Sequence, residues 1–129
     1  MKTRESVLCV VTNNPEAERL CEGREIAVVQ IDGMPLDVLD KAEALLQSAW
    51  KLVSAPLPPN IPMMRAPYRS LLLERNERRY DSAGILSIAA ARERFTAQST
   101  GERASAARED FAAIDAAFLE RALRDMSLL

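Results

Sequence analysis

The architecture of this chain follows from one stretch near its start, Val7-Leu8-Cys9-Val10-Val11-Thr12-Asn13-Asn14-Pro15. Its first five residues are apolar and rich in β-branched side chains, as in a central strand that is covered on both faces. Asn14 is a good N-cap and Pro15 a good first helical residue. We therefore predict a buried strand that runs directly into a short helix, from Glu16 to about Glu22.

The segments that follow continue the alternation of strand and helix. Residues 25–31 predict a second strand, closed by the turn dipeptide Asp32-Gly33. From Pro35 to Trp50 the apolar residues recur at helical spacing, which predicts an amphipathic helix that ends with Trp50 in the core. Two more strands are expected over 51–55 and 68–74, separated by a stiff, proline-rich loop.

Two helices are expected in the C-terminal part. Asp81 or Ser82 caps the first, whose apolar line is Ile85, Ile88, Ala89 and Phe95, with Leu86 beside it. The second runs from about Arg103 to Asp125, with its charges on a solvated face, and is expected to bury Ala107, Phe111, Ile114, Phe118 and Ala122.

The resulting order, β-α-β-α-β-β-α-α, predicts a single α/β domain over residues 1–129. Its expected centre is a small, mainly parallel four-stranded sheet with helices on its faces. Parallel connections usually contain a helix, and the loop before the fourth strand has none. We therefore favour an antiparallel orientation for this last strand.

Composition excludes several classes of function. The 129 residues carry a formal net charge of −2, which argues against nucleic-acid or anionic-membrane binding. The chain has no His, so imidazole bases and most catalytic zinc sites are excluded, and we assign no catalytic residue, metal or cofactor. No stretch approaches the length of a membrane span, and the two cysteines are expected to be reduced thiols, with Cys9 in the core. A cytoplasmic protein is expected.

A candidate binding site follows from the topology, because ligands of open α/β sheets bind outside the carboxyl ends of the strands. Guanidinium groups on the proline-rich loop would suit a carboxylate or a phosphate. Each part also has a purely structural interpretation: a helix cap at Asn14, an ordinary Asp-Gly turn, and a rigid cover for the sheet edge. The candidate ligand-binding residues are Thr12, Asn13, Asn14, Asp32, Gly33, Ser54, Arg65, Tyr68 and Arg69.

The chain resembles the GrdX family, small bacterial proteins encoded with the selenium-dependent glycine reductase. The resemblance rests on Thr12-Asn13-Asn14-Pro15, Ile31-Asp32-Gly33 and Pro67-Tyr68-Arg69-Ser70, each placed at the end or the start of an expected strand. It covers about Val7 to Leu73. The family tends to have a His-Pro pair before the proline-rich loop, where this chain has Ala55-Pro56. The resemblance implies an accessory role beside amino-acid reduction and provides no catalytic residue.

Three hypotheses of different classes remain open. The first is an accessory protein that recognises a small anionic ligand, or a protein of a reductase complex, through Asn13, Asn14, Arg65, Tyr68 and Arg69. The second is a small hydrolase of nucleotides or phosphoesters that uses Asp32 or Glu16 with a divalent metal. The third is a structural homodimer, formed through the proline-rich loop or the C-terminal helices.

Overall fold

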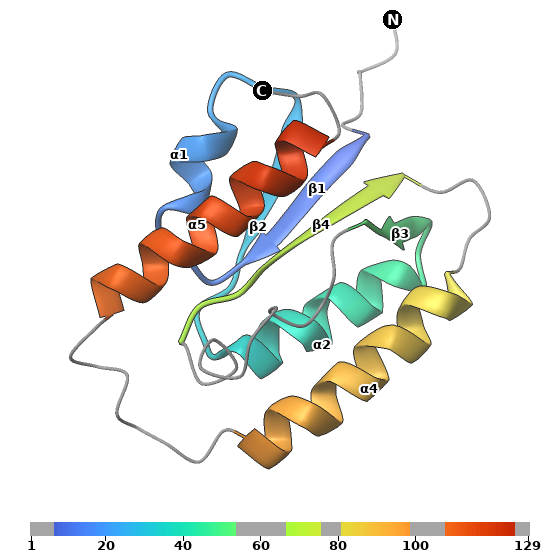
Figure 1. The fold of residues 1–129 in the computed structure, drawn as a ribbon. Coiled ribbons are helices and arrows are strands. Elements are labelled where there is room, and N and C mark those ends of the chain that lie inside the picture. Colours follow the sequence, from blue (N-terminus) through green and yellow to red (C-terminus); the bar gives the residue numbers. More distant parts are fainter. Residues whose placement is uncertain (1–6, 54–66, 76–80, 99–107, 126–129) are drawn as a thin grey trace, which may run out of the picture.

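The computed structural model describes residues 7–53, 67–75, 81–98 and 108–125, which form one sheet with helices on both of its faces (Figure 1). The expected order of strands and helices is confirmed. The elements are β1 (Leu8–Thr12), α1 (Ala17–Cys21), β2 (Ile26–Gln30), α2 (Pro35–Leu46), β3 (Trp50–Leu52), β4 (Ser70–Arg75), α4 (Ser82–Gln98) and α5 (Arg108–Asp125).

The sheet has the strand order β2-β1-β4-β3. β1 pairs in parallel with β2, with Thr12 opposite Gln30, and antiparallel with β4, with Thr12 opposite Ser70. The antiparallel fourth strand is therefore confirmed. The sheet is mixed rather than mainly parallel, because β4 inserts between β1 and β3 and both of its pairings are antiparallel. As a result β4 begins beside the end of β1.

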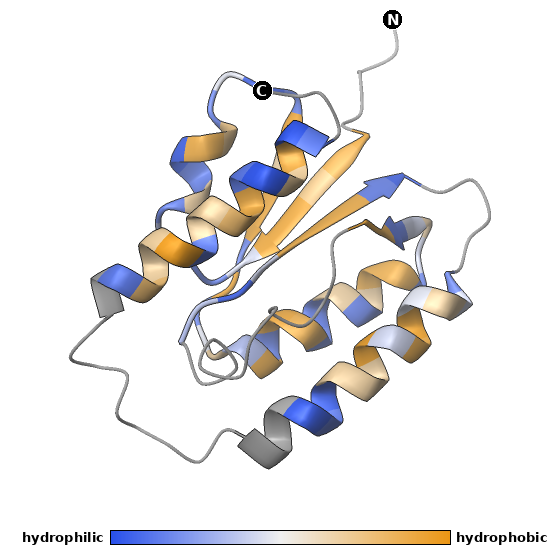
Figure 2. Cartoon of the chain, in the orientation of Figure 1, coloured by the Kyte–Doolittle hydropathy of each residue, from blue (hydrophilic) through white to orange (hydrophobic). Residues whose placement is uncertain are grey.

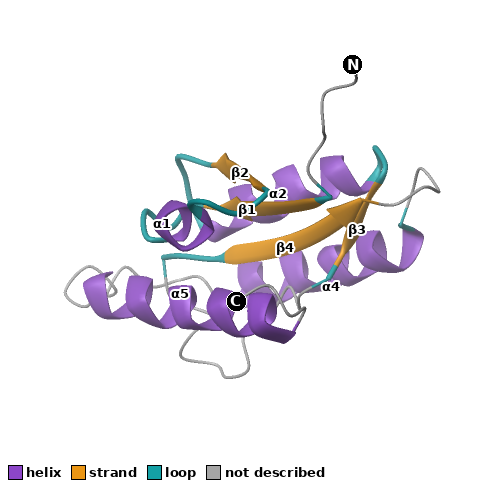
Figure 3. Cartoon of the chain, turned by 90° about the horizontal axis from the view of Figure 1, so that it is seen from above, coloured by secondary structure: helices purple, strands orange, loops and turns teal. Residues whose placement is uncertain are grey.

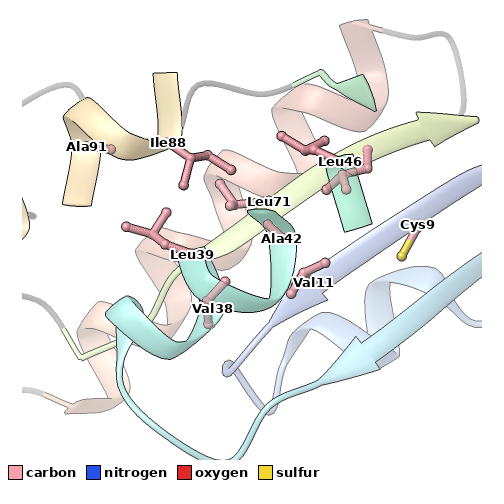
Figure 4. Packing of buried hydrophobic residues seen from close by; sticks show 10 residues of the cluster. Cys9, Val11, Val38, Leu39, Ala42, Leu46, Leu71, Ile88 and Ala91 are labelled. Carbon is pink, nitrogen blue, oxygen red and sulfur yellow. The ribbon is translucent and has the colours of Figure 1, made fainter. Parts of the chain in front are cut away.

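The helices cover the two faces of the sheet in pairs, α2 with α4 and α1 with α5 (Figure 3). Side chains of a strand alternate between its faces. Cys9 and Val11 pack towards α2, whereas Leu8 and Val10 pack towards α1 and α5. The close-up in Figure 4 shows the cluster on the α2 side, and Figure 2 shows the apolar residues concentrated on β1 and around it. The prediction of a central strand buried on both faces is confirmed.

The side chain of Asp81 joins α4 to β3 at one corner of the fold. It accepts hydrogen bonds from the backbone N–H of Gly84, at 3.0 Å, and from that of Leu52, at 2.9 Å. The first bond is an N-cap, because it occupies one of the N–H groups that the first turn of α4 leaves unpaired. The expected cap is thus confirmed, and the same carboxylate also binds the edge strand β3.

The α2 helix ends four residues earlier than predicted, at Leu46. Ala49 adopts a left-handed conformation with φ of 74°, which reverses the chain so that Trp50 begins β3. Trp50 is half-buried, and the Arg75 guanidinium lies 4.4 Å from its ring centroid. The prediction that Trp50 ends the helix was therefore wrong, but Trp50 does pack against the core on the α2 side.

The two C-terminal helices follow the predicted pattern to different degrees. In α4 the predicted Ile88 is buried and Ile85 packs against the core, together with the buried Ala91, whereas Leu86 is 70% exposed. In α5 the buried residues are Ala112, Asp115, Leu119 and Leu123, so the predicted face is rotated by one residue and Ile114 is 40% exposed. Ala107 lies outside the described residues, and so does the side chain of Phe95.

Cys9 and Cys21 are buried free thiols, as expected. Among the helices described, none combines the length and the apolar character needed to cross a membrane.

Candidate functional site

A buried group of polar side chains lies where β1 ends and β4 begins. On the face that α5 covers, Thr12 continues the row of Val10 and Ser70 continues the row of Leu72, and the two residues are directly opposite each other. We call the buried polar residues of this region the polar cluster: Thr12, Asn13, Asn14, Arg69, Ser70 and Asp115.

The hydroxyl groups of the polar cluster form a directed chain of hydrogen bonds. The backbone N–H of Asn14 donates to Thr12 Oγ1 at 2.9 Å, and the two hydroxyl oxygens of Thr12 and Ser70 lie 2.7 Å apart. Ser70 Oγ donates to Asp115 Oδ2 at 2.6 Å. Because the Ser70 proton is used on Asp115, the Thr12 hydroxyl donates to Ser70. All the protons therefore point from β1 towards a carboxylate on α5.

Asn13 holds three segments together. Its Nδ2 donates to the carbonyl oxygens of Gly33, at 2.9 Å, and Pro67, at 2.7 Å. Its Oδ1 accepts the backbone N–H of Arg69 at 2.8 Å. These bonds use both donors of the amide and its oxygen, so Asn13 joins the end of β1 to the turn after β2 and to the segment before β4.

Asn14 opens α1 and also binds α5. Its Oδ1 accepts the backbone N–H of Glu16 at 2.9 Å, a turn that leads into the helix at Ala17. Its Nδ2 donates to Ala112 O and to Asp115 Oδ2, both at 2.9 Å. The predicted N-cap at Asn14 is wrong, because the N-cap of α1 is Glu16 and has no side-chain cap hydrogen bond. Asn14 forms a turn just before the helix, which starts one residue later than predicted.

Arg69 and Asp115 bring opposite charges into this buried region. The side chains are 8% and 1% exposed, and Arg69 Nη1 lies 4.0 Å from Asp115 Oδ1. Burial lowers the pKa of the Arg69 guanidinium, and the charge of Asp115 opposes that shift. An arginine stays protonated even so, hence the sheet end contains a buried cation beside a buried anion.

The comparison with protein families gives a match over residues 9–124, to the model of the GrdX-like protein family. The chain belongs to the GrdX-like family. The match extends beyond the motifs of the N-terminal half and includes the helices that cover the sheet. No curated protein and no solved structure matches the chain.

In this GrdX-like protein the structure brings most of the predicted site residues to one end of the sheet. Thr12, Asn13, Asn14 and Arg69 are members of the polar cluster, and Tyr68 is half-buried beside it in the chain. Asp32 and Gly33 are exposed, and the Gly33 carbonyl joins them to Asn13. Ser54 and Arg65 lie outside the described residues, as does the proline-rich loop up to residue 66.

Two members of the polar cluster are missing from the prediction, Ser70 and Asp115. The charge pattern of the helix predicts a solvated Asp115, but Ala112, Leu119 and Leu123 share its face at steps of three and four. That spacing was the signal available in the sequence. Within the described part of the chain, no group of three or more Cys, Asp or Glu residues is arranged to hold a metal ion.

Proposed function

We propose that this GrdX-like protein is an accessory protein of a glycine reductase system that recognises an anionic group at the carboxyl end of β1 and β2. The anion would be a carboxylate or phosphate, carried by a small molecule or by the partner enzyme. Family membership supports the accessory role. One observation supports the place of recognition, namely the Arg69 guanidinium held at this end of the sheet.

The contacts assign different roles to the residues of this region. Asn13 and Asn14 use their amide groups on backbone and on Asp115, so they position the neighbouring segments. Asn13 binds the backbone N–H of Arg69, and the Arg69 side chain is buried beside Asp115, so its charge is held in place before any ligand arrives. Tyr68 and the exposed turn at Asp32 are the more accessible parts of the same region. A fixed cation with an accessible rim is suited to binding anions.

Thermal unfolding of the full chain tests the small-molecule form of this proposal. The probes are acetate, glycine, phosphate and acetyl phosphate at rising concentration. A ligand at ten times its Kd stabilises the folded state by about 1.4 kcal/mol, which raises Tm by about 5 °C for a domain of this size. Arg69→Lys, which keeps the charge and loses the planar fork, should reduce the shift, whereas the exposed control Arg121→Lys should leave it unchanged.

The partner-enzyme form is tested by sedimentation velocity with purified glycine reductase. Co-sedimentation that Arg69→Lys weakens and Arg121→Lys preserves would support it. If no anion raises Tm and no complex forms, the proposed recognition is wrong. If Arg69→Lys and Arg121→Lys show the same Tm shift and the same co-sedimentation, the anion is recognised elsewhere on the molecule.

A further inference from the structure

The two edges of the sheet differ in how they are protected. β3 has only three residues with Lys51 at its centre, and Asp81 accepts the outward N–H of Leu52. Short length, a lysine and a capped N–H are features by which edge strands avoid pairing. β2, at the opposite edge, has five residues and contains neither a charged residue nor a proline (Figure 3). Its residues 26–29 are half-buried and Gln30 is exposed.

The hydrogen bonds show which backbone groups of β2 face outward. Ile31 N–H donates to Thr12 O at 2.7 Å, and Thr12 is opposite Gln30. In a parallel ladder the backbone N–H and C=O groups of Val29 and Ile31 then point towards β1. The backbone groups of Val28 and Gln30 point away from it. Within the described part of the chain, no hydrogen bond reaches the backbone N–H of either residue.

We propose that β2 pairs antiparallel with β2 of a second copy of this chain, about a twofold axis at Val28. Val28 of each copy would exchange two hydrogen bonds, and Gln30 N–H would donate to the carbonyl of Ile26 in the other copy. The two four-stranded sheets would thereby join into one. A twofold axis requires a self-complementary surface, which an uncharged strand centred on valine provides.

The charges that flank β2 favour a second copy over an unrelated strand. Arg24 and Asp32 lie four residues before and four residues after Val28, and both are exposed. Both residues lie in the bends that flank β2, and the Arg24 guanidinium also donates to the carbonyl oxygens of Leu20 and Glu22. In the proposed pairing, the bend with Arg24 in one copy lies beside the bend with Asp32 in the other, twice per dimer. Opposite charges at facing positions stabilise strand pairs, and like charges destabilise them. The opposite charges at the two ends of β2 therefore favour an antiparallel second copy as the occupant.

Sedimentation equilibrium of the full chain at increasing concentration tests the proposal. The wild-type chain should form a dimer. Arg24→Glu and Asp32→Arg, tested singly, should each raise the dimer dissociation constant by about tenfold or more, because both charge pairs become repulsive. The double variant, which exchanges the charges, should return the constant to within about threefold of the wild-type value. Val28→Pro removes an N–H that β1 does not use and should abolish the dimer.

The outcomes separate the parts of this inference. A chain that stays monomeric at all concentrations overturns the proposal, and so does a dimer that Val28→Pro leaves intact. If Val28→Pro abolishes the dimer but the single charge reversals have no effect, the proposed register is wrong. If Val28→Pro fails to fold by far-ultraviolet circular dichroism, the charge exchange decides alone, with recovery in the double variant as the supporting result.

Discussion

Replacement of Asp115 by alanine should destabilise this protein more than any surface change. The side chain is 1% exposed and accepts hydrogen bonds from Ser70 and Asn14. It also carries the negative charge beside the buried Arg69 guanidinium. Asp115→Ala removes all three interactions at once and leaves a buried cation without this partner.

The expected loss in the free energy of unfolding follows from the buried Arg69–Asp115 pair. A hydrogen bond to a charged group is worth about 1.5–3 kcal/mol, and removal of one partner of a buried ion pair costs about 3–5 kcal/mol. These contributions overlap, so we expect Asp115→Ala to lower the free energy of unfolding by about 3–5 kcal/mol. Asp115→Asn keeps one acceptor oxygen and the shape of the side chain. It should cost about 1–3 kcal/mol, mainly through the lost charge.

Urea unfolding followed by the fluorescence of Trp50, the single tryptophan, measures both values. At an m-value of about 2 kcal/mol per molar, the midpoint should fall by about 2 M for Asp115→Ala. Asp125→Ala, at the exposed end of the same helix, is the matched control and should stay within about 0.5 kcal/mol of the wild type. A loss below about 1 kcal/mol for Asp115→Ala would refute the buried network as a stabilising element.

Two further predictions concern other buried groups. Asp81→Ala should cost about 2–3 kcal/mol in urea unfolding, because Gly84 N–H and Leu52 N–H both lose their acceptor, whereas Ser82→Ala should cost less than about 0.5 kcal/mol. Burial raises the pKa of the Cys9 thiol from 9.0 to about 11. The unfolded chain then loses this proton at lower pH than the folded chain, so stability should fall as pH rises from 9 to 11, and Cys9→Ala should show a smaller fall over that range.

The central part of the fold was predictable because its signals are local. The run Val7 to Val11 has no polar residue, so it fits only a strand that is covered on both faces. The loop before β4 contains no predicted helix, which favours a reversal of the chain and the antiparallel pairing that the structure has. The end of α2 was missed because Ala49 and Trp50 extend the apolar spacing of the helix. The left-handed conformation of Ala49, which reverses the chain, has no signal in that spacing.

The rotation of α5 was not predictable from that helix alone, because its sequence contains two interlaced apolar stripes. One holds Phe111, Ile114 and Phe118, and the other holds Ala112 and Leu119 with Asp115 between them. Hydropathy favours the first stripe, since a carboxylate interrupts the second.

The choice between the stripes depends on groups that are distant in sequence. The partners of Asp115 are 101 residues away at Asn14 and 45 residues away at Ser70. They meet α5 only after β4 has paired with β1, and the hydrogen bonds they then make offset the cost of burying the Asp115 carboxylate. The polar cluster therefore sets the rotation of α5 as well as the closure of the sheet end. It follows that Arg69, the group on which the proposed anion recognition depends, is held by the same contacts that orient the last helix.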